Sequence, residues 1–130
     1  MKNTFSCFLL ALASLIASCS YSSSDYTADL GSGYTFVSES NTHQIISGPH
    51  DTAWVGVVPC TVEKYEYDDK NVIVKQKVNP NCIEQDLSKL PLAYWIIDKK
   101  RNMVHGPLDS LTFLMKRKEL MVSSSLEFNK

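Results

Sequence analysis

The chain has 130 residues, enough for one small domain, and its 13 basic and 14 acidic side chains give a net charge of −1. Proteins that bind the phosphate backbones of nucleic acids usually carry a strongly basic surface, which a nearly neutral chain does not predict. We therefore expect no nucleic acid as a partner. A chain of about this length can bury one modest core, so we expect it to fold without a metal ion or a disulfide, and we expect no cofactor.

Residues 1–18 have the composition of a secretory signal peptide. Lys2 precedes an apolar run over Phe5–Ala17, which is too short for an ordinary membrane span. Cys19 directly follows small residues, and the segment resembles the lipobox of bacterial lipoproteins, in which the cysteine receives diacylglycerol and becomes the first residue after cleavage. We predict that lipid on Cys19 attaches the protein to the cell membrane or outer membrane, on the extracytoplasmic side. An ordinary secretory signal that contains a cysteine is the alternative.

Polar residues dominate positions 19–32, which we predict to be a flexible tether between the lipid and the domain. A single domain is expected over residues 33–122, because short β-rich runs separated by turn signals begin there. Residues 123–130 follow the last predicted helix, and we expect them to form a frayed tail.

Short strands are expected at the start of this domain. The composition predicts one strand over Gly33–Ser38 and a shorter one over His43–Ser47. A turn signal follows at Gly48–Asp51. Ala53–Val58 then has the composition of a further strand.

The clearest hairpin in the sequence joins Cys60–Tyr67 to Val72–Val78. The loop between them, Asp68–Asn71, is polar. Asn71 tolerates the left-handed conformation that a short loop needs.

Pairing across this loop sets aromatic residues opposite β-branched ones, Tyr67 with Val72 and Tyr65 with Val74. Such cross-strand pairs contribute about 0.2–1 kcal/mol each. The other face of the hairpin carries charged side chains and is expected to face water. Its residues are Lys64, Glu66, Lys75 and Lys77.

Cys60 and Cys82 remain once the predicted signal peptide and lipid site are set aside. A bridge between them would close a loop of about twenty residues and stabilise the fold by about 3 kcal/mol. The pair lacks Cys-x-x-Cys spacing, so a redox-active site is not indicated. A structural disulfide and two free thiols both remain open.

The segment Tyr94–Asp98 is apolar on both faces, which predicts a central strand covered on both sides. A short return strand is expected over Met103–Gly106. We interpret Gly106-Pro107 as a corner between this strand and the next element. Ile83–Leu90, earlier in the chain, is compatible with one or two helical turns.

A closing helix is predicted from Asp109, the expected N-cap, through about Met121. Helical spacing places apolar residues on one face, with Arg117 among them, where it would extend to solvent or pair with a carboxylate. The expected fold is α+β, a small meandering antiparallel sheet closed by this C-terminal helix. The predicted apolar face consists of Leu111, Phe113, Leu114, Met115, Leu120 and Met121.

The segment Tyr94–Lys100, with Gly106-Pro107-Leu108 and Lys116–Leu120, resembles an uncharacterised family of small bacterial lipoproteins that is classed only as a domain of unknown function. Leu30–Tyr34 and Val72–Gln76 are similar to that family's opening strand and hairpin return. The resemblance implies a lipobox and a mostly β domain, and it implies no activity.

The three histidines are His43, His50 and His105. His43 and His50 could form a metal site with Cys60, but the tight paired spacings of zinc sites are absent. We therefore expect loop histidines in solvent and no metal site.

No catalytic constellation is evident in the sequence. Ser47-Gly48 beside His50-Asp51 has the composition of a turn, and no nucleophile motif surrounds a serine. An exposed hairpin tip offers no cleft that would raise the pKa of a carboxylate. We therefore expect no enzyme. The hairpin carboxylates are Glu63, Glu66, Asp68 and Asp69.

Aromatic residues could line a binding surface, since they concentrate at interfaces, but a small β domain needs the same residues for its core. We assign most of them to the core. The preferred function is a non-enzymatic envelope lipoprotein that binds an unknown envelope protein. An inhibitor or immunity lipoprotein against a toxin or a cell-wall hydrolase is the alternative, and an envelope enzyme is the third possibility. The aromatic residues considered are Trp54, Tyr65, Tyr67, Tyr94 and Trp95.

Overall fold

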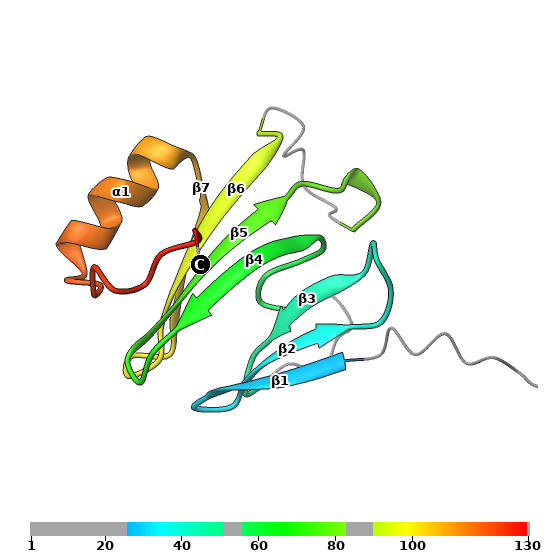
Figure 1. The fold of residues 1–130 in the computed structure, drawn as a ribbon, viewed down its shortest axis with the longest axis horizontal. Coiled ribbons are helices and arrows are strands. Elements are labelled where there is room, and N and C mark those ends of the chain that lie inside the picture. Colours follow the sequence, from blue (N-terminus) through cyan, green and yellow to red (C-terminus); the bar gives the residue numbers. More distant parts are fainter. Residues whose placement is uncertain (1–25, 51–55, 83–89, 130) are drawn as a thin grey trace, which may run out of the picture.

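The computed structural model describes residues 26–50, 56–82 and 90–129. Within these ranges the chain forms two antiparallel sheets and a helix near the C-terminus (Figure 1). The predicted α+β class is confirmed, although the strands divide between two sheets instead of forming one. The predicted signal peptide, Cys19 and nearly all of Ile83–Leu90 lie outside the described residues.

The first sheet has three strands in the order β1-β2-β3. β1 spans Tyr26–Gly31, β2 spans Tyr34–Ser38 and β3 spans Gln44–Ser47. Because β1 lies inside the segment predicted to be a tether, the prediction for 19–32 is wrong over its last part. The physical reason is Leu30, which is 0% exposed in the core. This burial and the backbone pairing with β2 help to fix a strand that is otherwise polar.

The second sheet has four strands in the order β4-β5-β6-β7, so each strand pairs with the next one in the chain. The predicted hairpin is formed by β4 and β5, and its register is the predicted one, with Tyr65 opposite Val74 and Tyr67 opposite Val72. The strand bounds are Val62–Tyr67 for β4, Asn71–Lys77 for β5, Leu92–Asp98 for β6 and Met103–Leu108 for β7.

The turn between β4 and β5 is closed by Asp68. Its Oδ1 atom accepts the backbone N–H groups of Lys70 and Asn71, both at 2.8 Å, as is typical of aspartate at the start of a turn. The left-handed conformation predicted for Asn71 is wrong, because this residue is buried in β5 and its side-chain amide donates to the carbonyl of Ile97. Asn102, in the turn between β6 and β7, does take a left-handed conformation, with φ 52°.

The middle strands β5 and β6 are covered on both faces, as the apolar pattern of Tyr94–Asp98 predicted. One face packs against the three-stranded sheet, and the other packs against α1 (Ser110–Glu119) and the segment after it. The molecule therefore has three layers. The first core contains Leu30, Tyr34, Phe36, Ile46, Val58, Val62, Val72, Val74, Trp95 and Ile97. The second contains Ile73, Ile96, Phe113 and Leu126.

The charged face of the hairpin is only partly exposed, which corrects the prediction that it faces water. Ile73 on this face is fully buried under the helix layer. Lys64 is exposed but its Nζ atom donates to the carbonyl of Phe128 at 3.2 Å, and Lys75 pairs with Glu63 at 3.1 Å. The sheet face is covered because the C-terminal segment folds back over it.

β7 continues through Gly106 and Pro107 to Leu108, where a corner was predicted. The register between β6 and β7 shifts opposite this point, which indicates a bulge. Gly106 has φ 153°, and a Cβ atom on it would lie 2.5 Å from Cε3 of Trp95. Glycine at this position therefore allows β7 to pass directly against the indole ring.

Lys99 connects the two sheets. It lies in the turn after β6, yet it is buried, and its ammonium group donates to the carbonyls of Leu30 and Asp68. The same group lies 5.2 Å from the centre of the Tyr67 ring. Burial lowers the pKa of Lys99 from its ordinary value, and the carboxylates of Asp68, Asp69 and Asp29 partly offset this effect. One side chain thus holds β1 against the β4–β5 turn.

We expect Lys99→Met to lower the free energy of unfolding by about 2 kcal/mol, because methionine keeps an apolar stem but leaves two carbonyls without their donor. Urea unfolding followed by tryptophan fluorescence measures this change. Lys100→Met, at the exposed neighbouring position, is the matched control and should shift stability by less than about 0.5 kcal/mol. Equal effects of the two substitutions would contradict the linking role of Lys99.

Candidate functional site

α1 begins where the sequence predicted. Asp109 caps it by accepting the N–H of Thr112 at 2.7 Å, and this hydrogen bond lowers the pKa of Asp109 from its ordinary value. The C-cap is Leu120, and Met121 then takes a left-handed conformation with φ 52°. No helix in the described part of the chain has the length and apolar character needed to cross a membrane.

α1 contacts the four-stranded sheet mainly through one side chain, Phe113, which is its buried residue. The Phe113 ring stacks on Tyr94 of β6 at 5.0 Å between centroids and on Phe128 at 5.9 Å. Leu120 packs against the margin of this cluster. The helix therefore rests on a narrow aromatic contact, part of which comes from the segment that follows it.

The segment after α1 packs against the sheet, so the prediction of a frayed tail over 123–130 is wrong for the residues described. Leu126 is 5% exposed in the second core. Arg117 holds the segment in place, because its Nη2 atom donates to the carbonyls of Ser123 and Leu126 at 3.0 and 2.8 Å. Arg117 was predicted to reach solvent or pair with a carboxylate, and it instead binds backbone carbonyls and lies over the Phe113 ring.

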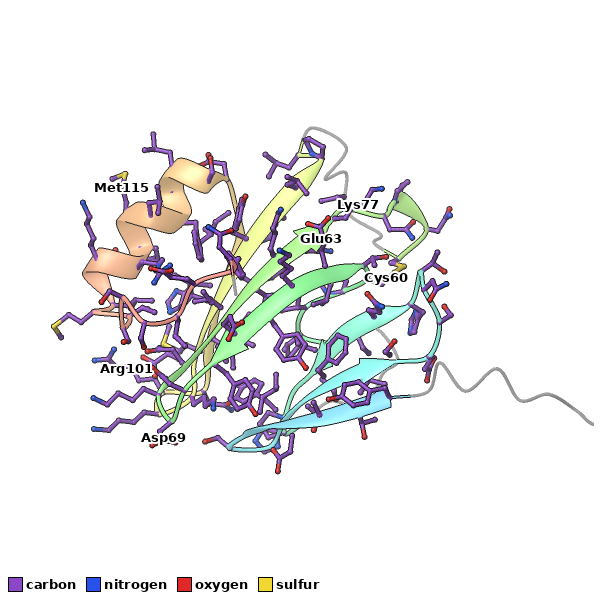
Figure 2. The ribbon with its side chains drawn as sticks, viewed as in Figure 1. Cys60, Glu63, Asp69, Lys77, Arg101 and Met115 are labelled. Carbon is purple, nitrogen blue, oxygen red and sulfur yellow. A yellow bond between two sulfur atoms is a disulfide. The ribbon has the colours of Figure 1, made fainter. Side chains whose placement is uncertain are left out.

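The opposite side of α1 exposes large apolar side chains. Leu111, Leu114 and Met115 are 68%, 54% and 64% exposed, and Met121 just after the helix is 87% exposed. Figure 2 shows Met115 on the side of α1 away from the sheets. All four were predicted to face the core, and that prediction is wrong. We call these four residues the outer face of α1.

The outer face has the chemistry of a binding surface. Burying a large apolar side chain contributes about 1.5–3 kcal/mol, and contiguous exposed apolar patches usually mark interaction sites. Lys118 follows Leu111 and Met115 at the seven- and three-residue spacings of one helix face, so a positive charge lies within the patch. Lys116, nearer the sheet, is already paired with Glu119 at 3.0 Å.

A second group of chemically reactive side chains lies away from α1. Cys60 and Cys82, for which the sequence left both states open, are joined by a disulfide with a Cα–Cα distance of 5.8 Å. Figure 2 places Cys60 on the side of the molecule away from α1 and Met115. Cys82 ends a short 3-10 helix, η1 (Pro80–Cys82).

His43 lies beside this disulfide. One of its ring nitrogens and the two cysteine sulfurs all lie within 4.8 Å of one another. Its Nε2 atom is 3.6 Å from Oε2 of Glu39. His50, which the sequence grouped with His43 and Cys60, is exposed in a turn. Of the three residues considered as a metal site from the sequence, His43 and Cys60 therefore lie close together, and Cys82 lies beside them in place of His50.

The third histidine and the hairpin carboxylates, which the sequence offered as candidate site residues, do not form a site with one another. His105 is half-buried in β7. Glu63 pairs with Lys75, Asp68 closes its turn, and Asp69 is exposed at the hairpin tip (Figure 2). Glu66 is half-buried in β4.

The aromatic candidates are mostly core residues, as predicted. Trp95 is buried, and its Nε1 atom donates to Oε1 of Gln76 at 2.7 Å. Tyr65 is half-buried and packs 4.6 Å from Phe36 between ring centroids. Tyr67 is exposed at the surface and covers the ammonium group of Lys99. Trp54 lies outside the described residues.

A surface hollow of about 710 Å³ lies beside Lys99. Its lining includes Asp29, Asp68 and Asp69 together with Tyr67. The ammonium group there is held by two backbone carbonyls, which leaves it poorly placed for attack on a substrate. The arrangement supports a structural role for Lys99 in place of a nucleophilic one.

A family model described as protein of unknown function (DUF3997) matches residues 31–130. The matched range contains the outer face of α1 and the cluster of His43, Cys60 and Cys82. No curated protein and no solved structure matches the chain.

Proposed function

The chain belongs to the DUF3997 family of proteins of unknown function, and we propose that it is a non-enzymatic lipoprotein of the bacterial envelope that binds a protein partner. The observation that carries the binding proposal is the outer face of α1, with its four exposed large apolar residues. The anchoring proposal rests on the lipobox-like segment that ends at Cys19.

The position of the outer face relative to the proposed anchor favours a protein over the membrane as its occupant. The start of β1 and α1 lie toward opposite ends of the long axis of the molecule (Figure 1). The chain between Cys19 and Tyr26 spans about 25 Å at most when fully extended. Lipid on Cys19 would therefore hold the β1 end near the membrane, and the outer face would point toward other envelope proteins.

The chemistry of the outer face defines the partner. Leu111 and Met115 offer apolar contacts, and the adaptable methionine side chain suits a surface that packs against another protein. Lys118 adds a positive charge within the patch, so the partner should present an apolar surface with a carboxylate near its centre. Truncating a central residue of such an interface weakens binding by about tenfold or more.

We expect a photo-reactive amino acid at Leu114 to form one discrete adduct with a protein in cells that express the full, lipidated chain. The same amino acid at Asp69, which is exposed on the hairpin tip, should not form that adduct. Once the adduct is identified by mass spectrometry, the binding of the purified partner can be measured directly. Met115→Glu should then weaken binding by at least about tenfold.

Thr112→Glu is the matched control, because it adds the same charge at the flank of the helix and should leave binding unchanged. A cross-link to lipid, a cross-link to a second copy of the chain, or equal effects of the two glutamate substitutions would each contradict the proposal. The anchor is tested in the same cells, because Cys19→Ala should release the protein from the membrane fraction.

A further inference from the structure

His43, Cys60 and Cys82 form a group with the composition of a soft-metal site. Their ligand atoms lie within 4.8 Å of one another. Two sulfurs and an imidazole nitrogen around a tetrahedral zinc ion are about 3.5–3.8 Å apart. Small rotations of the cysteine side chains would bring the three atoms to these distances once the sulfur–sulfur bond is broken.

Two of the three ligands are held on a common backbone framework. The hydroxyl of Thr61 donates to the carbonyl of Thr42 at 2.7 Å, which ties the residue after Cys60 to the residue before His43. The carbonyl of Cys60 accepts a hydrogen bond from Nε2 of Gln76 at 3.1 Å. These contacts do not involve the disulfide, so they remain available when it is reduced.

The surroundings of His43 also resemble those of a metal ligand. Its backbone N–H donates to the hydroxyl of Ser40 at 3.0 Å, and its imidazole lies beside the carboxylate of Glu39. A carboxylate at the ring nitrogen that does not bind the metal orients a ligand histidine, and Glu39, 3.6 Å from Nε2, would take this role with Nδ1 as the zinc ligand. Cys60 is fully buried and His43 is half-buried, so the site would be partly shielded from water.

We propose that reduction of the disulfide converts this group into a zinc site with His43, Cys60 and Cys82 as ligands. An external dithiol supplies the electrons by thiol–disulfide exchange, in which it becomes a disulfide and each protein cysteine gains a hydrogen. Zn²⁺ then displaces the two thiol protons to solvent and binds two thiolates and a neutral imidazole. Three protein ligands leave a fourth position for water, as in zinc sites with an open coordination position.

The test uses the full chain with Cys7→Ser and Cys19→Ser, so that Cys60 and Cys82 are its only thiols. The protein is reduced with a water-soluble phosphine, which is removed before titration with Zn²⁺ against a chromophoric chelator. We expect the reduced protein to bind one zinc ion per chain and the oxidised protein to bind none. Co²⁺ in place of zinc should give the charge-transfer absorption of thiolate ligands and the visible bands of tetrahedral coordination.

Substitutions separate this site from adventitious binding. His43→Ala should weaken zinc binding at least about tenfold, whereas His50→Ala, at an exposed histidine outside the cluster, should bind as the parent does. Circular dichroism of each reduced variant checks that the fold is kept. The proposal is overturned if the reduced parent binds no more zinc than a Cys60→Ala/Cys82→Ala variant. It is also overturned if His43→Ala has no effect, or if the reduced chain unfolds and zinc does not restore it.

Discussion

Replacing Ile97 with alanine is expected to lower the free energy of unfolding by about 4 kcal/mol. Ile97 is fully buried in β6, opposite Val72 of β5 and Val104 of β7, and it faces the three-stranded sheet. Its neighbours belong to paired strands that cannot move closer without breaking backbone hydrogen bonds. The cavity left by alanine would therefore stay open, which places the cost toward the upper part of the range for such truncations.

Urea unfolding monitored by tryptophan fluorescence measures this change, because Trp95 lies in the same core. Met103→Ala is the control, since this β7 residue is about half exposed and its truncation should cost less than about 0.5 kcal/mol. Ile96→Ala removes the same side chain from the opposite face of β6. A loss below about 1 kcal/mol for Ile97→Ala would contradict the role of this contact in joining the two sheets.

The second sheet was largely predictable because its information is local. Cross-strand partners in the β4–β5 hairpin are fixed by the loop length, so Tyr65 and Val74 could be paired from their positions alone. The apolar character of β6 on both faces likewise required two covering layers, and both are present. The local sequence pattern did not predict that the strands divide between two sheets.

The two ends of the domain were mispredicted because one long-range contact can fix a polar segment. β1 is fixed by Leu30 and by the ammonium group of Lys99, which lies far along the chain. The C-terminal segment is fixed by Leu126 and by the hydrogen bonds from Arg117. Composition averages over such segments and does not register a single anchoring residue.

The orientation of α1 was mispredicted for a related reason. Helical spacing shows which residues share a face, but α1 is apolar around much of its circumference. Phe113 faces the sheet because Tyr94 and Phe128 form an aromatic cluster with it. Phe128 lies beyond the predicted helix, so the sequence of the helix alone does not show that a contact with Phe128 helps to determine which side of α1 is buried. The residues left outside became the proposed binding surface.

The group around His43 could not be found by motif spacing. Zinc motifs are recognised when ligands are two to five residues apart, whereas here the β2–β3 turn brings His43 to a disulfide that joins residues 22 positions apart. The sequence contains suitable ligand residues, but only the topology shows that His43 lies beside Cys60 and Cys82 and that His50 does not. The spacing of these residues in the sequence therefore does not distinguish a metal site from solvent-exposed histidines, whereas their positions in the fold do.

Removing the disulfide by the double substitution Cys60→Ala/Cys82→Ala is expected to lower the free energy of unfolding by about 3 kcal/mol. The bridge closes a loop with a sequence separation of 22, and without it the unfolded chain gains conformational freedom that the folded chain does not. Urea unfolding of the oxidised parent, the reduced parent and the double variant measures this loss. The reduced parent should lose nearly as much as the variant.

The same comparison tests whether the disulfide and the proposed zinc site are alternative cross-links at one place. Zinc at a hundred times its dissociation constant should return about 2.7 kcal/mol to the reduced parent, because it binds the folded chain. The double variant lacks both thiolates and should gain nothing from zinc, while its loss of stability remains. If zinc stabilised both proteins equally, its binding would lie elsewhere. If the double variant matched the oxidised parent, loop closure by the disulfide would contribute little to the fold.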